Sequence, residues 1–113
     1  MTDCLFCAIA SGAIPAEIVS ESDRVVVFRD VSPQAPVHVL AIPRAHFANV
    51  GELAAKDPVL AAELLTAATQ AATDLGLAQG YRVVFNTGNE GGQSVNHVHA
   101  HVLGGRQLTW PPG

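Results

Sequence analysis

The chain has little of the basic charge that nucleic-acid-binding proteins carry. Charged residues make up 14% of its 113 residues, six of them are lysine or arginine, and the formal net charge is -4. Because no basic surface for a nucleic-acid backbone is present, we expect no nucleic-acid partner. The single lysine, Lys56, follows no glycine-rich Walker sequence, which excludes the ordinary phosphate-binding lysine loop.

Long apolar runs and a basic leader are also missing. No segment approaches the ~18–20 apolar residues of a membrane-spanning helix. The first six residues include Asp3 and no basic residue, and Gly12 and Pro15 interrupt the apolar residues that follow. We therefore expect a cytoplasmic protein without a signal peptide or a membrane span. Cysteine is limited to Cys4 and Cys7, which in such a compartment indicate free thiols or metal ligands more than a disulfide.

Length and hydrophobic content predict one domain over residues 1–113, because 49% of the residues are hydrophobic. The clearest helix follows Asp57, a good N-cap, with Pro58 at the first helical position and Gly76 just past the end. A short helix is expected at 5–11, and strands are expected at 17–20, 24–28, 37–42, 81–86 and 95–103. These elements predict an α+β fold: an antiparallel sheet of about five strands, one long helix and a short N-terminal helix.

Three of the five histidines, His97, His99 and His101, alternate with small apolar residues. In a strand this period of two places the three imidazoles on one face and the apolar side chains on the core face. Histidine is not a preferred strand or core residue, so a purely structural explanation for all three is weak. The row therefore indicates chemistry.

Two chemistries fit the histidine row. In the first, two of the histidines bind a metal and His38 or His46 adds a ligand. In the second, a neutral imidazole attacks phosphorus while a neighbouring histidine protonates the leaving group. The glycine-rich segment 87–93 precedes the row, and Asn86 and Ser94 add neutral donors at its ends. Such a loop holds an anion without lysine, which favours phosphorus chemistry.

The segment 97–103 resembles the motif of the histidine triad (HIT) superfamily, in which three histidines alternate with apolar residues. Segments 30–36, 42–46 and 91–97 match the same family, and the ending at 104–113 resembles its Hint branch. The likeness covers nearly the whole chain. It implies a HIT-like fold and a homodimeric purine nucleoside phosphoramidate hydrolase without a catalytic cofactor. A covalent nucleotidyl-histidine would form, and a nucleoside monophosphate would be released from an amine.

The resemblance also implies roles for individual residues. His99 would be the nucleophile, His101 would lie near the phosphate and leaving group, and His38 would orient His99 through its other ring nitrogen. Trp110 would reach toward the partner subunit's site. The expected nucleotide-binding residues are Asn86, Gln93 and Ser94 with the Gly92 loop at the phosphate, Asp30 at the ribose, and Leu5, Phe6, Ile9, Ile14, Phe28 and Val31 around the base. Several of these have a plainer explanation, because apolar residues fill cores and an aspartate before a proline forms turns.

Cys4 and Cys7 form a C-x-x-C pair. Similarity to prokaryotic HIT proteins implies that they hold a structural zinc together with His46 and His97. A closed set of four ligands leaves no position for substrate, so such a zinc would not take part in the reaction. The alternative is a pair of buried thiols on the short N-terminal helix.

Three other functions remain compatible with these residues. The first is a dinucleoside polyphosphate hydrolase, which the ending at Trp110 disfavours. The second is a nucleotide-binding module with little turnover. The third is a hydrolase that uses the histidine row as ligands for a catalytic metal.

Overall fold

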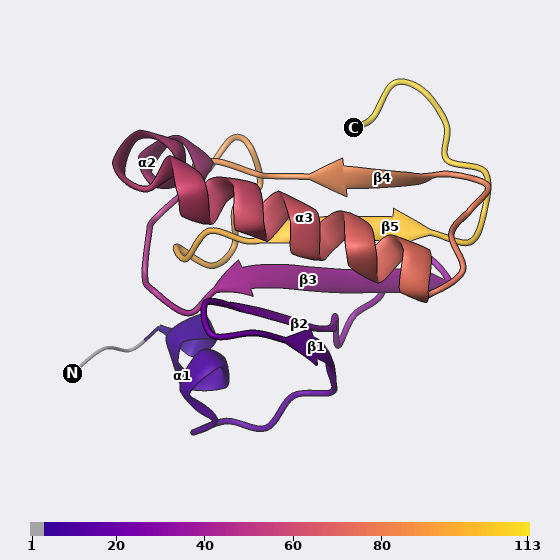
Figure 1. Cartoon of the computed structure of the whole chain (residues 1–113). Coiled ribbons are helices and arrows are strands. Elements are labelled where there is room, and N and C mark those ends of the chain that lie inside the picture. Colours follow the sequence, from indigo (N-terminus) through magenta and orange to yellow (C-terminus); the bar gives the residue numbers. More distant parts are fainter. Residues whose placement is uncertain (1–3) are drawn as a thin grey trace.

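The computed structural model describes residues 4–113, so Asp3, which entered the argument against a signal peptide, lies outside the described part of the chain. Five strands form one sheet in the order β1-β2-β3-β5-β4, and every neighbouring pair is antiparallel (Figure 1). The strands are β1 (Ile18–Glu21), β2 (Val25–Arg29), β3 (Val37–Pro43), β4 (Tyr81–Val84) and β5 (Ala100–Gly104), and the helices are α1 (Leu5–Ser11), α2 (Val50–Lys56) and α3 (Pro58–Asp74). The predicted α+β class is confirmed.

The long helix α3 lies across one face of the sheet (Figure 1). Asp57 caps it as predicted, because its Oδ1 accepts a hydrogen bond from the N–H of Leu60 at 3.0 Å and Pro58 occupies the first turn. Leu60, Leu64 and Ala68 are fully buried on the face that meets the strands, and alanine lets the helix approach the sheet closely. The helix has 17 residues, and within residues 4–113 no helix is both long and apolar enough to cross a membrane.

The strands divide their side chains between two apolar clusters, one on each face of the sheet. The cluster under α3 takes Val25 and Val27 of β2, Val39 and Ala41 of β3, and Ala100 and Val102 of β5. The cluster on the opposite face joins Val26, Phe28, Leu40 and Ile42 to Phe6 and Ala10 of α1. Leu40 pairs directly with His101, and directly paired residues share a face. His101 therefore lies on the same face as α1.

The helix α2 covers a segment for which the sequence analysis makes no prediction. Its N-cap is Asn49, whose Oδ1 accepts a hydrogen bond from the N–H of Glu52 at 2.9 Å. In return a carboxylate oxygen of Glu52 accepts a hydrogen bond from the N–H of Ala48 at 2.8 Å, and this bond lowers the pKa of Glu52. Two N–H groups at the start of the helix are thus satisfied reciprocally, in the manner of a capping box.

The prediction of a strand over 95–103 is wrong in its first half, because β5 spans only Ala100–Gly104. β3, the neighbour of β5, ends at Pro43, which has no N–H with which to extend the ladder. The N–H of Val98 donates to the carbonyl of Phe47 at 2.7 Å instead. Of the three clustered histidines, only His101 lies in the strand. The other strands differ from expectation by one or two residues at their ends.

Candidate functional site

The backbone immediately before His99 fixes the orientation of its ring. The Nδ1 atom of His99 lies 2.8 Å from the carbonyl oxygen of His97. A carbonyl oxygen only accepts hydrogen bonds, so Nδ1 carries the hydrogen and Nε2 of the neutral ring keeps its lone pair. The Phe6 ring stands edge-on to His99 with centroids 5.0 Å apart, and His99 is 4% exposed. The contacts therefore hold a nucleophilic nitrogen in one orientation.

His38 of β3 and His101 of β5 form a second histidine pair. The N–H of Gln34 donates to Nδ1 of His38 at 3.0 Å, so neutral His38 carries its hydrogen on Nε2. That Nε2 donates to Nδ1 of His101 at 2.9 Å, which leaves the hydrogen of neutral His101 on its own Nε2. The expected partner of His38 is thus corrected from His99 to His101. The cause is strand register, because Leu40, two residues after His38 on the same face, pairs with His101.

Burial lowers the pKa of both members of this pair. The pKa of His101 falls to about 4, chiefly through desolvation and further through the neighbouring His99 and His38. Desolvation also lowers the pKa of His38, although the Asp30 carboxylate, 3.4 Å from its Nε2, acts in the opposite direction. Both rings are therefore neutral near pH 7, which agrees with the hydrogen positions that the contacts require.

An apolar hollow of about 470 Å³ lies beside His99 and His101. Its walls contain all the residues expected around a base, namely Leu5, Phe6, Ile9, Ile14, Phe28 and Val31, together with Asp30 and Ser94. Val31 is 97% exposed, so it is not a core residue, whereas Phe28 is buried and also serves the core. An apolar wall with a few polar groups at one side is the usual form of a small-molecule site.

A second hollow, of about 340 Å³, also borders His101. It contains His38 and Asn86, so Asn86, expected at the phosphate, lies in this hollow and not in the apolar one. Arg82 and Arg106 line the same hollow. The sequence analysis does not single out these two arginines, because no local pattern marks them and their proximity depends on the fold.

Gln93 holds the glycine-rich loop together. Its amide nitrogen donates to the carbonyls of Ala48 at 2.6 Å and Val95 at 3.0 Å, and its amide oxygen accepts from the N–H of Gly88 at 3.1 Å. Gly92 has a φ of 80° and forms a turn in the same loop. Neither Gln93 nor Gly92 lines either hollow. The side chain of Gln93 is thus engaged in the loop and not in the space where a phosphate was expected.

Asp30 combines a turn contact with a place in the site. One of its oxygens accepts a hydrogen bond from the N–H of Ser32 at 2.8 Å, as a turn-forming aspartate does. The other oxygen faces Nε2 of His38 at 3.4 Å, and the residue borders the apolar hollow. Both explanations offered by the sequence therefore agree with its position.

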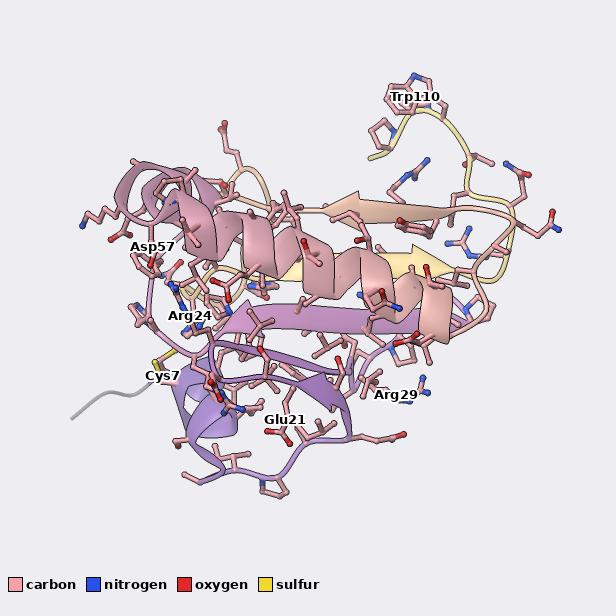
Figure 2. The ribbon with its side chains drawn as sticks, viewed as in Figure 1. Cys7, Glu21, Arg24, Arg29, Asp57 and Trp110 are labelled. Carbon is pink, nitrogen blue, oxygen red and sulfur yellow. The ribbon has the colours of Figure 1, made fainter. Side chains whose placement is uncertain are left out.

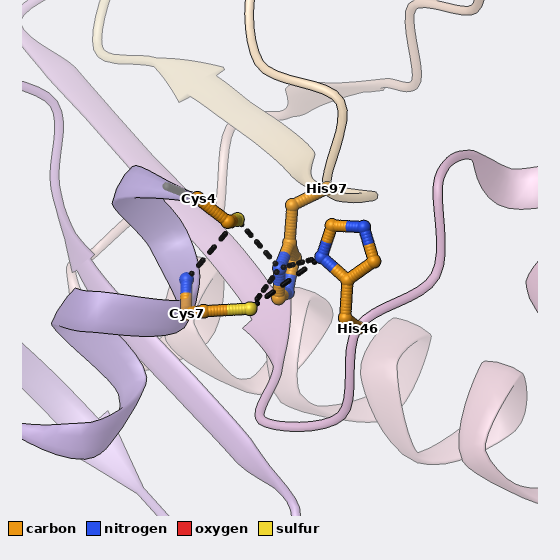
Figure 3. A group of neighbouring side chains, drawn as sticks. All are labelled: Cys4, Cys7, His46 and His97. Carbon is orange, nitrogen blue, oxygen red and sulfur yellow. Dashed lines mark hydrogen bonds between the residues drawn. The ribbon is translucent and has the colours of Figure 1, made fainter. Parts of the chain in front are cut away.

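Cys4, Cys7, His46 and His97 converge at the start of α1 (Figure 3). Nδ1 of His97 lies 3.3 Å from Sγ of Cys4, 3.5 Å from Sγ of Cys7 and 3.2 Å from Nδ1 of His46. Sγ of Cys7 lies 3.4 Å from Nδ1 of His46. The four donor atoms all lie within 4.8 Å of one another. The fold thus brings together the four residues that the sequence assigns to a metal.

These spacings fit a tetrahedral zinc. Zn–S bonds of about 2.3 Å and Zn–N bonds of about 2.0–2.1 Å place neighbouring ligand atoms roughly 3.3–3.8 Å apart. His97 donates from Nε2 to the carbonyl of Pro43 at 2.8 Å, which leaves Nδ1 unprotonated and available as a ligand. Burial lowers the pKa of His97 and so favours the neutral ring that a metal requires.

The family model described as HIT domain matches residues 11–108 of this chain. The chain belongs to the HIT family. A crystal structure of a HIT family hydrolase from Legionella pneumophila Philadelphia 1 is 50% identical, with a TM-score of 0.94 over 98% of this chain and 100% of that one. A histidine triad protein from Clostridium difficile is 38% identical, with a TM-score of 0.91 over 96% of each chain. An uncharacterized HIT-like protein of Synechococcus elongatus is 50% identical over 98% of this chain and 97% of its own.

The HIT family assignment, made from the histidine motif, is therefore confirmed. In this HIT protein Trp110 lies on the C-terminal segment beyond β5 and is 81% exposed (Figure 2). Its expected approach to a partner subunit stays a prediction.

Proposed function

We propose that this HIT protein is a purine nucleoside phosphoramidate hydrolase with His99 as its nucleophile. The observation that carries the proposal is the hydrogen bond from Nδ1 of His99 to the His97 carbonyl, which leaves the Nε2 lone pair beside the apolar hollow. That hollow has room for a nucleoside, and Asp30 borders it as an acceptor for ribose hydroxyls. The HIT family hydrolase that aligns with the whole chain supports hydrolytic chemistry.

The reaction proceeds in two displacements at phosphorus. The Nε2 lone pair of His99 forms a bond to phosphorus while the P–N bond of the substrate breaks, and the amine nitrogen takes the electron pair and a proton. Water then attacks the same phosphorus, the bond to Nε2 breaks, and the nucleoside monophosphate leaves. Ser94, which follows the glycine-rich loop and borders the apolar hollow, supplies a donor to the phosphate.

His101 delivers the proton to the amine. The ring is neutral in the free protein, but the negative charge of a bound phosphate raises its pKa. His101 then takes a proton from the solvent at Nδ1, where the hydrogen bond from His38 is given up. Its Nε2–H is the group that meets the leaving nitrogen. His38 acts through His101, because in the free protein its hydrogen bond from Nε2 holds the His101 ring and fixes which nitrogen faces the substrate.

Cys4, Cys7, His46 and His97 would hold a structural zinc. The metal would supply a fixed link between α1 and the loop that carries His97. His97 would serve this site through its ring and the reaction through its carbonyl, which orients His99.

We further propose that residues 1–113 act as one domain in a cytoplasmic homodimer, with Trp110 near the partner's site. The exposure of Trp110 leaves its indole available for such a contact. Sedimentation of the protein and of Trp110→Ala tests the assembly. The activity of the variant tests the place of the indole.

Mass spectrometry of the trapped protein tests the mechanism. The zinc-loaded protein is mixed with adenosine 5′-monophosphate joined through nitrogen to a fluorescent amine and is quenched within the first turnover. We expect the mass of one adenylyl group on the peptide that contains His99. His99→Ala should form no adduct and should lose turnover by at least about a thousandfold. Full activity in this variant, with an unchanged melting temperature, contradicts the mechanism.

The same substrate set separates the alternatives. Faster turnover of diadenosine polyphosphates than of phosphoramidates assigns the protein to the dinucleoside branch. Nucleotide binding without steady-state turnover identifies a binding module. If chelation abolishes turnover while nucleotide affinity and the melting temperature persist, a catalytic metal replaces the proposed role of His99.

A further inference from the structure

Four of the six basic side chains of this acidic protein form ion pairs with carboxylates. The pairs are Arg24 with Asp57 and Glu63, Arg29 with Glu17, Arg44 with Glu21, and Lys56 with Glu52, at 2.5–3.2 Å. Arg24 lies beside Asp57 near the start of α3 (Figure 2). The remaining two, Arg82 and Arg106, pair with none of the carboxylates in residues 4–113.

The two arginines without a carboxylate lie together, between a hollow of about 520 Å³ that contains no histidine and the smaller hollow that borders His101. Both line the hollow of about 340 Å³ that contains His38 and His101. Arg82 stands on β4 two residues before Val84, and Val84 pairs directly with His101. The strand period therefore places Arg82 on the same face of the sheet as His101.

Both guanidinium groups are oriented by backbone carbonyls. Arg82 donates from one Nη to the carbonyl of Thr109 at 2.9 Å, and Arg106 donates to the carbonyls of Gln34 at 3.1 Å and Gln107 at 3.3 Å. A carbonyl carries no net charge, so these bonds hold the groups in position and leave their positive charges uncompensated. Each guanidinium has five N–H donors and keeps several for a ligand.

His101 borders both hollows, whereas His99 borders only the apolar one. If a nucleoside fills the apolar hollow, as proposed above, the group that His101 protonates departs on the side of the second hollow. We propose that Arg82 and Arg106 bind an anionic group on that leaving group. The preferred substrates are then nucleotidyl conjugates whose leaving group carries a carboxylate or a phosphate. This inference rests on the proposed function and specifies its substrate class.

Matched substrates test the inference. Adenosine 5′-phosphoramidates of alanine are prepared with a free carboxylate and with a neutral carboxamide, which differ in one charge. We expect kcat/KM for the acid to exceed that for the amide by about tenfold at low salt, since a charge-assisted hydrogen bond is worth at least that factor. Adenosine 5′-phosphoramidates of phosphoethanolamine and of ethanolamine, both joined through nitrogen, form the other arm, in which the anion is a phosphate. The arm with the larger preference identifies the source of the anion.

Arg82→Gln and Arg106→Gln should each lower the ratio of acid to amide, because each removes one of the two charges, and the double variant should bring the ratio close to one. Arg82→Lys should keep part of the preference, and the preference should fall at high ionic strength. Lys56→Gln is the control, since it removes one positive charge on α2 and should leave the ratio unchanged. Melting temperatures show whether each variant is folded.

Equal kcat/KM for acid and amide in the wild type overturns the inference and leaves the proposed function intact, because the amide is still hydrolysed through His99. Failure of the wild type to cleave any of the substrates contradicts the proposed function instead. If Arg82→Gln lowers the turnover of acid and amide equally and dissociates a dimer, the arginines serve assembly, and the inference is wrong.

Discussion

Replacing Cys7 with serine should remove most of the stabilisation that the proposed zinc would give to this protein. Cys7 is a cleaner choice than Cys4, because Sγ of Cys4 also accepts a hydrogen bond from the N–H of Cys7 at 3.3 Å and caps α1. Serine keeps the size and the helix position but offers a much weaker zinc ligand. Ser11→Ala on the same helix is the matched control, since its hydroxyl bonds only to the carbonyl of Ala8.

The expected size of the effect follows from linkage. A ligand that binds only the folded state stabilises it by about 2.7 kcal/mol at a free concentration one hundred times its Kd. For a domain of this length each kcal/mol shifts the melting temperature by roughly 3–6 °C, so zinc should raise it by roughly 10 °C. Zinc should slow amide hydrogen exchange most in α1, because two of the four ligands lie on this helix or at its N-cap and the helix buries only Phe6 and Ala10.

The assay is thermal unfolding of chelator-treated protein with and without a buffered excess of free zinc. Amide hydrogen exchange then locates the change. We expect zinc to raise the melting temperature by roughly 10 °C in the wild type and in Ser11→Ala, and by less than about 3 °C in Cys7→Ser. An equal rise in Cys7→Ser, or none in the wild type, refutes the assignment of the four residues to one metal site.

Three further predictions concern stability. The depressed pKa of His101 means that the unfolded chain binds more protons between pH 6.5 and about 4, so the free energy of unfolding should fall by about 1–2 kcal/mol as pH decreases through that window. Urea titrations at several pH values give the free energy of unfolding against pH. Its slope over this window should be smaller in His101→Gln, and an unchanged slope contradicts the lowered pKa of His101. Leu64→Ala should cost about 2–5 kcal/mol in the same assay, because Leu64 of α3 is fully buried against the sheet. Asp57→Ala should cost about 1–2 kcal/mol, because it removes both the cap on Leu60 and the ion pair with Arg24, whereas Asp57→Asn should keep most of the cap.

Sequence signals that act locally, such as caps and helix-ending glycines, predict α1 and α3 well. Asp57 and Pro58 define the start of α3, and Gly76, with a φ of 80°, lies just past its end, as glycine's freedom at positive φ allows. A similar signal was available for α2, since Asn49 and Glu52 stand three apart as in a capping box. The signal is weak because α2 has only 7 residues and ends just before Pro58.

The site is only partly predictable. The alternation of residues in a strand predicts which face of the sheet a side chain occupies, but it does not predict which residue on a neighbouring strand it contacts. Alternation correctly separates the histidines from the core residues between them, yet it cannot give the register that pairs Leu40 with His101 and so joins His38 to His101. The sequence likewise gives no signal that Arg82 and Arg106 lie beside His101. Their position beside His101 depends on the register of β4 against β5 and on the segment that follows β5.

The three histidines look equivalent in the sequence, but they differ in which of their atoms are engaged. His97 uses Nδ1 toward the cysteines, Nε2 toward the Pro43 carbonyl and its own carbonyl toward His99. All three of these groups contact protein atoms, so neither ring nitrogen of His97 is left for a substrate. Within residues 4–113, His99 and His101 each use Nδ1 in a hydrogen bond to the protein. His99 therefore keeps a lone pair on Nε2 and His101 keeps a hydrogen on Nε2, and both rings border the apolar hollow. A nucleophile and a proton donor are what the proposed cleavage of a phosphoramidate requires, and this hydrogen-bond pattern supports the assignment of the first task to His99 and of the second to His101.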